Sequence, residues 1–152
     1  MAHKISMPKW SKSPFSAEQD EFQRVSKDKH IPLPLLRQKY QTSTTVKLTD
    51  TIWRVLDNTE SFRTMSENQM RTLMRTYKRD VDAVLAEFHK GVVRCPIILR
   101  TGAPGKYHYH LVAGNTRLCI ARFVKLQPTV QLVSIPLAAM PVKAVNHKGA
   151  RK

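Results

Sequence analysis

The sequence predicts an α+β fold, with helices in the first 90 residues and alternating strands and a helix after them. Apolar residues recur at helical spacing over residues 66–88, which is typical of an amphipathic helix. After Gly91 they occur instead in short runs bounded by Pro and Gly, as in strands. Of the 152 residues, 41% are apolar, which is enough to build one core.

Short elements are expected before the main helix. The spacing of a capping box that starts at Ser16 predicts a helix over residues 16–28. Two prolines within residues 30–36 favour an extended segment there and argue against a long helix. A short strand is predicted at 46–48, followed by a short helix over 49–56 that Thr49 caps.

The main helix is predicted to run from a capping box at Ser66 and Gln69 to Gly91, where a glycine suits the C′ position. The face opposite its apolar stripe is basic, with Arg71, Arg75, Lys78 and Arg79. This face is either a solvated surface or a surface that faces nucleic acid.

The second half reads as a strand–turn–strand–helix–strand unit. Strands are predicted at 92–99, 107–113 and 130–135, and a Gly- and Pro-containing turn at 101–105. A helix is predicted over 116–126. It begins after Gly114 and Asn115, which end the second strand, and it stops before Gln127 and Pro128. A single domain is therefore expected.

This domain is expected over residues 15–140, between a basic arm at 1–14 and a basic tail at 141–152. The N-terminus has no signal-peptide core, and no apolar run approaches the roughly 20 residues of a membrane span. We therefore expect a cytoplasmic protein without a membrane partner. Cys95 and Cys119 do not form a disulfide framework and are expected to be reduced.

Charge is distributed unevenly along the chain. The net charge is +15, and the last 65 residues carry 11 Lys and Arg but no Asp or Glu. A field of one sign attracts polyanions, so nucleic acid is the expected partner, bound with little sequence preference. The candidate contacts are Arg94, Arg100, Lys106, Arg122 and Lys125.

The turn Gly114–Arg117 lies between a predicted strand and a predicted helix, which is a geometry that binds anions. Gly114 permits a sharp turn and close approach of a ligand, and Asn115 can cap the helix. Thr116 adds a hydroxyl donor, and Arg117 adds a guanidinium that matches phosphate oxygens. The alternative is an ordinary, well-capped strand-to-helix junction.

The order of these pieces resembles the ParB/sulfiredoxin superfamily over residues 66–135. The matching pieces are the helix end Phe88-His-Lys-Gly91, the strand Pro96-Ile-Ile-Leu99, the strand Tyr109-His-Leu-Val-Ala-Gly114 and the turn Gly114-Asn-Thr-Arg117. The resemblance implies a small mixed sheet packed against helices, here with extra N-terminal helices. It also implies a nucleotide or phosphate ligand at Gly114–Arg117, with Mg²⁺ if the ligand is a nucleoside triphosphate, and a role with DNA.

The chain departs from this pattern at the turn. Sulfiredoxins place their reactive cysteine where Asn115 stands, so that activity is excluded. Asn115 and Thr116 also replace ionisable residues of the ParB-type sites. We find no room for a helix-turn-helix DNA reader in these 152 residues and therefore do not expect a partition protein. Within the superfamily, the turn of this chain resembles those of small proteins found commonly in bacteriophages, which implies a bacterial or phage-infected cell.

Asp80 and Glu87 are the candidate catalytic carboxylates, because they lie seven residues apart on one flank of the predicted long helix. The alternative is that both are helix-surface charges. His108 and His110 have no neighbouring ligand in sequence, so no metal site is predicted from them.

The expected function is a ParB-like nucleotide- or phosphate-binding protein associated with nucleic acid. Two other classes stay open. One is a phosphoryl-transfer enzyme or nuclease of the same superfamily, which would use the N-terminal carboxylates. The other is a non-enzymatic phage protein that binds an acidic host partner through its charge.

Overall fold

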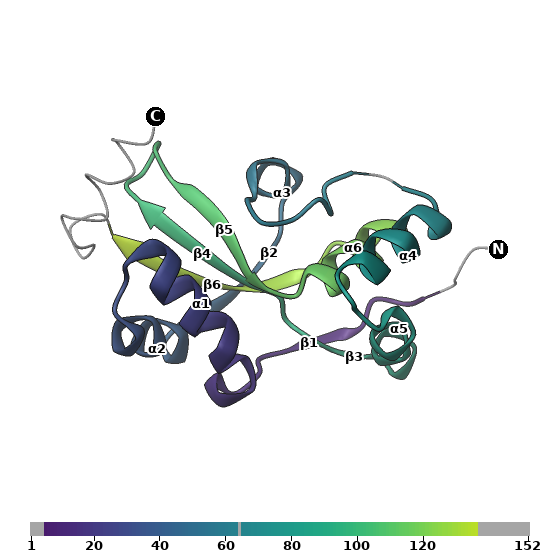
Figure 1. The fold of residues 1–152 in the computed structure, drawn as a ribbon, viewed down its shortest axis with the longest axis horizontal. Coiled ribbons are helices and arrows are strands. Elements are labelled where there is room, and N and C mark those ends of the chain that lie inside the picture. Colours follow the sequence, from purple (N-terminus) through teal and green to yellow (C-terminus); the bar gives the residue numbers. More distant parts are fainter. Residues whose placement is uncertain (1–4, 64, 137–152) are drawn as a thin grey trace.

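The computed structural model describes residues 5–63 and 65–136 (Figure 1). The elements are β1 (Lys9–Ser11), η1 (Phe15–Glu18), α1 (Gln19–Lys29), α2 (Leu33–Gln41), β2 (Thr44–Lys47), α3 (Asp50–Val55), α4 (Glu67–Thr76), α5 (Val81–Lys90), β3 (Val92–Arg94), β4 (Ile97–Gly102), β5 (His108–Ala113), α6 (Asn115–Phe123) and β6 (Thr129–Pro136). The predicted tail at 141–152 lies outside the described residues. So do residues 1–4 of the predicted arm and residues 137–140 of the predicted domain.

A mixed four-stranded sheet with the order β2-β6-β4-β5 confirms the predicted α+β class. β4 and β6 run parallel, while β2 pairs with β6 and β5 with β4 in antiparallel fashion. Ile98 in β4 lies opposite Leu132 on one side and Leu111 on the other. The remaining pair is parallel and joins β1, from the predicted N-terminal arm, to β3.

Two apolar clusters cover the two faces of the sheet, because successive strand residues point to opposite sides. On one face, α1 and α2 pack through Phe22, Leu36 and Tyr40 against Ile97, Leu99 and Val133. On the other face, the helices after β2 pack through Trp53, Met70, Met74, Phe88 and Leu118 against Ile98, Leu111 and Val130. Figure 1 shows α1 and α2 side by side on one side of the sheet and α4, α5 and α6 grouped at the other end.

The prediction of one long helix from Ser66 to Gly91 is wrong. The capping box at Ser66 and the left-handed Gly91 are both present, but the helix is interrupted between α4 and α5. Lys78 adopts a left-handed backbone with φ 58°, and Asp80 caps α5 by accepting from the Ala83 N–H at 3.0 Å. Aspartate favours caps because its carboxylate competes for backbone donors, and here it starts a second helix.

The prolines at 30–36 do not prevent a helix. α2 begins at Leu33 with Pro34 in its first turn, where the missing N–H has no helical acceptor to lose. The predicted capping box at Ser16 is also wrong. Ser16 lies within the 3₁₀ turn η1 that precedes α1, and no side chain caps the start of either element. The predicted cap at Thr49 is confirmed, because its hydroxyl accepts from the Ile52 N–H at 3.3 Å.

The predicted strand at 92–99 is two strands, β3 and β4, and Pro96 lies between them. A proline cannot donate to a sheet ladder, which accounts for the interruption. The two strands belong to different sheets, so this break turns the chain from the β1–β3 pair into the main sheet.

Candidate functional site

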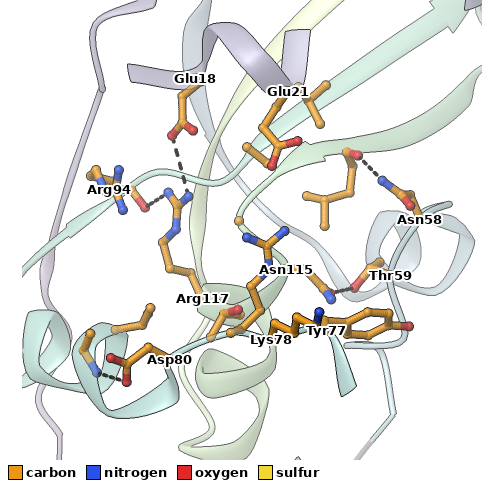
Figure 2. A pocket seen from close by; sticks show the side chains of 18 of the residues that line it. Glu18, Glu21, Asn58, Thr59, Tyr77, Lys78, Asp80, Arg94, Asn115 and Arg117 are labelled. Atoms are coloured by element: carbon orange, nitrogen blue, oxygen red, sulfur yellow. Dashed lines mark hydrogen bonds and ion pairs between the residues drawn. The ribbon is translucent and has the colours of Figure 1, made fainter. Parts of the chain in front are cut away.

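A cavity of about 730 Å³ lies where three separate parts of the chain meet the start of α6 (Figure 2). One wall comes from η1 and α1, a second from the loop at 58–60 and a third from the α4–α5 junction. The lining includes Glu18, Glu21, Arg24, Asn58, Thr59, Glu60, Tyr77, Lys78, Arg79, Asp80, Glu87, Arg94 and the whole turn Gly114–Arg117. The predicted binding turn and both predicted catalytic carboxylates are therefore brought to one cavity.

Gly114 is the N-cap of α6, with a left-handed backbone at φ 105°. The prediction that Asn115 caps this helix is wrong, because Asn115 is already its first residue and no side chain caps the helix. A Cβ atom on Gly114 would lie 2.8 Å from Pro96 Cβ and 2.9 Å from Pro96 Cα. Glycine is therefore required here by the packing of Pro96 as well as by the backbone angle.

The side chains of Asn115 and Thr116 are directed at the protein. The Thr59 hydroxyl donates to Asn115 Oδ1 at 2.6 Å, which joins the loop at 58–60 to the turn. The Thr116 hydroxyl is buried and lies 3.4 Å from Met74 Sδ. What the turn offers the cavity is therefore its backbone and the N-terminal end of the α6 dipole.

Arg117 is only 7% exposed and is held by the protein itself. Its Nη1 donates to the carbonyl oxygens of Arg94 at 3.0 Å and Cys95 at 3.3 Å. Its Nη2 lies 3.6 Å from Glu18 Oε2, an ion pair longer than a hydrogen bond (Figure 2). Burial lowers the pKa of Arg117, and the nearby Glu18 carboxylate opposes that shift.

The two candidate catalytic carboxylates have structural contacts. Asp80 caps α5 through one oxygen, and Glu87 Oε1 lies 3.7 Å from Arg94 Nε. Both nevertheless line the cavity. Glu18, which the sequence patterns did not single out, is buried, and its Oε2 accepts no hydrogen bond within the described residues.

Lys78 and Arg79 were predicted only as part of a basic helix face. The break between α4 and α5 instead places both in the cavity lining. Neither side chain makes a hydrogen bond or an ion pair within residues 5–63 and 65–136. The sequence signal that could have indicated this break is Asp80 itself, because aspartate is strongly preferred at helix N-caps.

The cavity as a whole is balanced in charge. It is lined by five carboxylates and by five Lys or Arg side chains. Three of the five cations are paired with carboxylates of the same cavity, in the pairs Arg24–Glu21, Arg94–Glu87 and Arg117–Glu18. The two cations left over are Lys78 and Arg79.

The five candidate nucleic-acid contacts are distributed over three places. Arg94 lines the cavity, Arg100 and Lys106 lie on the β4–β5 hairpin, and Arg122 and Lys125 line a second hollow of about 390 Å³. Several have internal partners: Arg122 lies 3.9 Å from the Trp53 ring centre and 3.0 Å from Asp50 Oδ1, and Arg100 lies 4.2 Å from the Tyr107 ring centre.

The two thiols do not offer a nucleophile. Cys95 and Cys119 are both buried and free. Burial raises the pKa of Cys119 to about 12, with Glu60 adding to the shift, and burial also raises the pKa of Cys95. Because the thiolate is the reactive form, neither residue is a nucleophile at neutral pH.

Comparison with known protein families, curated proteins and solved structures finds no match to this chain. Among the described residues, no three His, Cys, Asp or Glu side chains form a group that could hold a metal ion. None of the helices in the same part of the chain is long and apolar enough to cross a membrane.

Proposed function

We propose that the protein binds a phosphate-bearing ligand, a nucleotide, between the Gly114–Arg117 turn and the α4–α5 junction. The observation that carries this proposal is a pair of cations, Lys78 and Arg79, in the same cavity as the start of α6. Among residues 5–63 and 65–136, neither cation has a hydrogen-bond or ion-pair partner, and no side chain caps the helix. A helix N-terminus attracts anions through its dipole and its free N–H groups, and two adjacent cations add charge-assisted donors. The motif order supports a place in the ParB/sulfiredoxin superfamily.

The assignment of roles differs from the one that the sequence suggests. Arg117 is engaged by Glu18 and two carbonyls, so Lys78 and Arg79 are assigned the phosphate oxygens. A triphosphate would bring Mg²⁺, which in such sites is coordinated by one or two carboxylates beside the phosphates. Asp80 and Glu87 line the cavity and are the carboxylates that would coordinate the ion.

Lys78→Ala and Arg79→Ala are each expected to weaken nucleotide binding about 10- to 150-fold, since hydrogen bonds to charged groups contribute about 1.5 to 3 kcal/mol. Calorimetric titration with ATP, CTP and GTP, with and without Mg²⁺, measures this loss. Arg75→Ala is the matched control: it removes an exposed cation of α4 outside the cavity lining. No binding by the unmodified protein, or equal losses in all three variants, would contradict the proposal.

Association with nucleic acid is the second part of the proposed function, and the acid-free stretch after Glu87 supports it. Each phosphate contact contributes about −0.9 to the slope of log K against log salt on duplex DNA. Four contacts therefore predict a loss of binding on the order of a hundredfold between about 50 and 200 mM salt.

Titration of a fluorescent duplex and a single strand at several salt concentrations measures this slope. Arg100 and Lys106 are the first candidates for substitution, because Arg122 and Arg94 are already paired with Asp50 and Glu87. An absence of binding at the lowest salt concentration would favour the alternative of an acidic protein partner.

A phosphoryl-transfer or nuclease activity is the alternative within the same site. It is favoured by one observation, that Asp80 and Glu87 line the cavity of the proposed ligand. Turnover of ATP or of labelled DNA that is lost in Glu87→Gln, with nucleotide binding retained, would establish it. Binding without turnover would leave the protein a nucleotide-binding module.

A further inference from the structure

Tyr77 presents an aromatic ring to the cavity. It is the C-cap of α4, is 48% exposed and belongs to the cavity lining. By contrast, Phe22, Phe88, Tyr40 and Trp53 are all buried in the core. Burial of an aromatic side chain is favourable, so the half-exposed ring of Tyr77 still has apolar surface that a ligand could cover.

Two hydrogen-bonding contacts restrain Tyr77. Its hydroxyl donates to Glu60 Oε2 at 3.1 Å, and its backbone N–H is tied into the last turn of α4. The same contact with Glu60 raises the pKa of Tyr77, so the phenol stays protonated and the ring is uncharged at neutral pH. A side chain that is restrained in this way loses less conformational entropy when a second ring stacks on it than an unrestrained one does.

The proposed phosphate-binding cations follow Tyr77 directly in the chain. Lys78 and Arg79 share the cavity lining with the ring, and Figure 2 shows Tyr77 and Lys78 together along one side of the cavity, facing Glu18 and Glu21 across it. The break between α4 and α5 thus brings into one cavity lining an aromatic ring and two cations that have no partner within the described part of the chain. A cavity of about 730 Å³ is also far larger than a phosphate group requires.

We propose that the ligand is a nucleoside phosphate whose base stacks on the ring of Tyr77 while its phosphate contacts Lys78 and Arg79. This inference rests on the proposed function and adds a residue that determines which phosphate compounds bind. Stacking of a base on an aromatic side chain contributes about 1 to 3 kcal/mol, which corresponds to roughly 5- to 150-fold in affinity. Sugar phosphates without a base would lack this contribution.

AMP and ribose 5-phosphate test the proposal, because they carry the same sugar phosphate and differ in the base. Their dissociation constants are measured by calorimetry on the full chain and on Tyr77→Phe and Tyr77→Ala. AMP is expected to bind at least about fivefold more tightly than ribose 5-phosphate to the unmodified protein and to Tyr77→Phe, which keeps the ring. In Tyr77→Ala the two compounds are expected to bind equally, with ribose 5-phosphate unaffected.

The failures of the two proposals are distinguishable. If neither compound nor any nucleoside triphosphate binds the unmodified protein, the proposed function fails. If ribose 5-phosphate binds as tightly as AMP, the phosphate site stands and the stacking proposal is overturned. A preference for AMP that survives in Tyr77→Ala also overturns it, because the base then lies elsewhere. Circular dichroism checks that Tyr77→Ala folds, and Tyr77→Leu replaces it if it does not.

Discussion

Gly114→Val is expected to destabilise the protein by about 3 to 5 kcal/mol. A β-branched residue is strained at φ 105°, and its Cβ would overlap Pro96 at 2.8 Å. Pro96 cannot easily withdraw, because it separates β3 from β4 and its carbonyl accepts from the Gln131 N–H at 2.9 Å. Chemical denaturation of the two proteins measures the difference.

Gly91→Val is the matched control. Gly91 also has a left-handed backbone, at φ 87°, but a Cβ there would meet nothing within 4 Å. It therefore reports the strain alone, and the excess loss in Gly114→Val reports the contact with Pro96. Equal losses from the two substitutions would show that Pro96 yields to a larger residue and that the packing argument is wrong.

Arg117→Ala is expected to cost about 3 to 5 kcal/mol of stability, since it leaves a buried carboxylate without its counterion. The sequence suggests instead that Arg117 points at a ligand and that its removal would spare the fold. Glu18 is 6% exposed and pairs with Arg117, and the carbonyl oxygens of Arg94 and Cys95 would also lose their donor. Thermal and chemical unfolding of the variant measure the loss.

Glu18→Gln provides the control for this experiment. In a Glu18→Gln background no carboxylate charge is left buried, so Arg117→Ala should cost less than it does in the unmodified protein. A loss below about 1 kcal/mol that is the same in both backgrounds would show that the pair contributes nothing. Arg117 would then be available to a ligand after all.

Local sequence signals predicted those elements that depend on local chemistry. Ser66 and Thr49 have the cap interactions that their spacing indicates, and Gly91 ends its helix in the left-handed conformation. The errors occurred where one local signal has two structural outcomes. Pro34 is compatible with an extended segment and with a first helical turn. The apolar residues before and after Asp80 keep helical spacing, so the same pattern fits one long helix and two shorter helices with a break between them.

The candidate site was predicted only in part, for a different reason. The turn at Gly114–Arg117 was found because its residues are adjacent in the chain. Glu18 lies about 100 residues away and reaches Arg117 only through the packing of η1 and α1 against the sheet. Local patterns carry no information on such a contact, so the sequence could not show that Arg117 already has a partner.

The net charge of the chain and the charge of the cavity lining differ, and the two act differently on an approaching anion. The chain as a whole carries +15, so any anion is drawn toward it, and salt weakens that attraction. Inside the cavity, five carboxylates oppose five cations. A continuous polyanion that entered this cavity would bring its charges against these carboxylates, so its entry would be opposed by repulsion. If the proposed nucleotide site is correct, salt should therefore weaken surface association more than binding in the cavity.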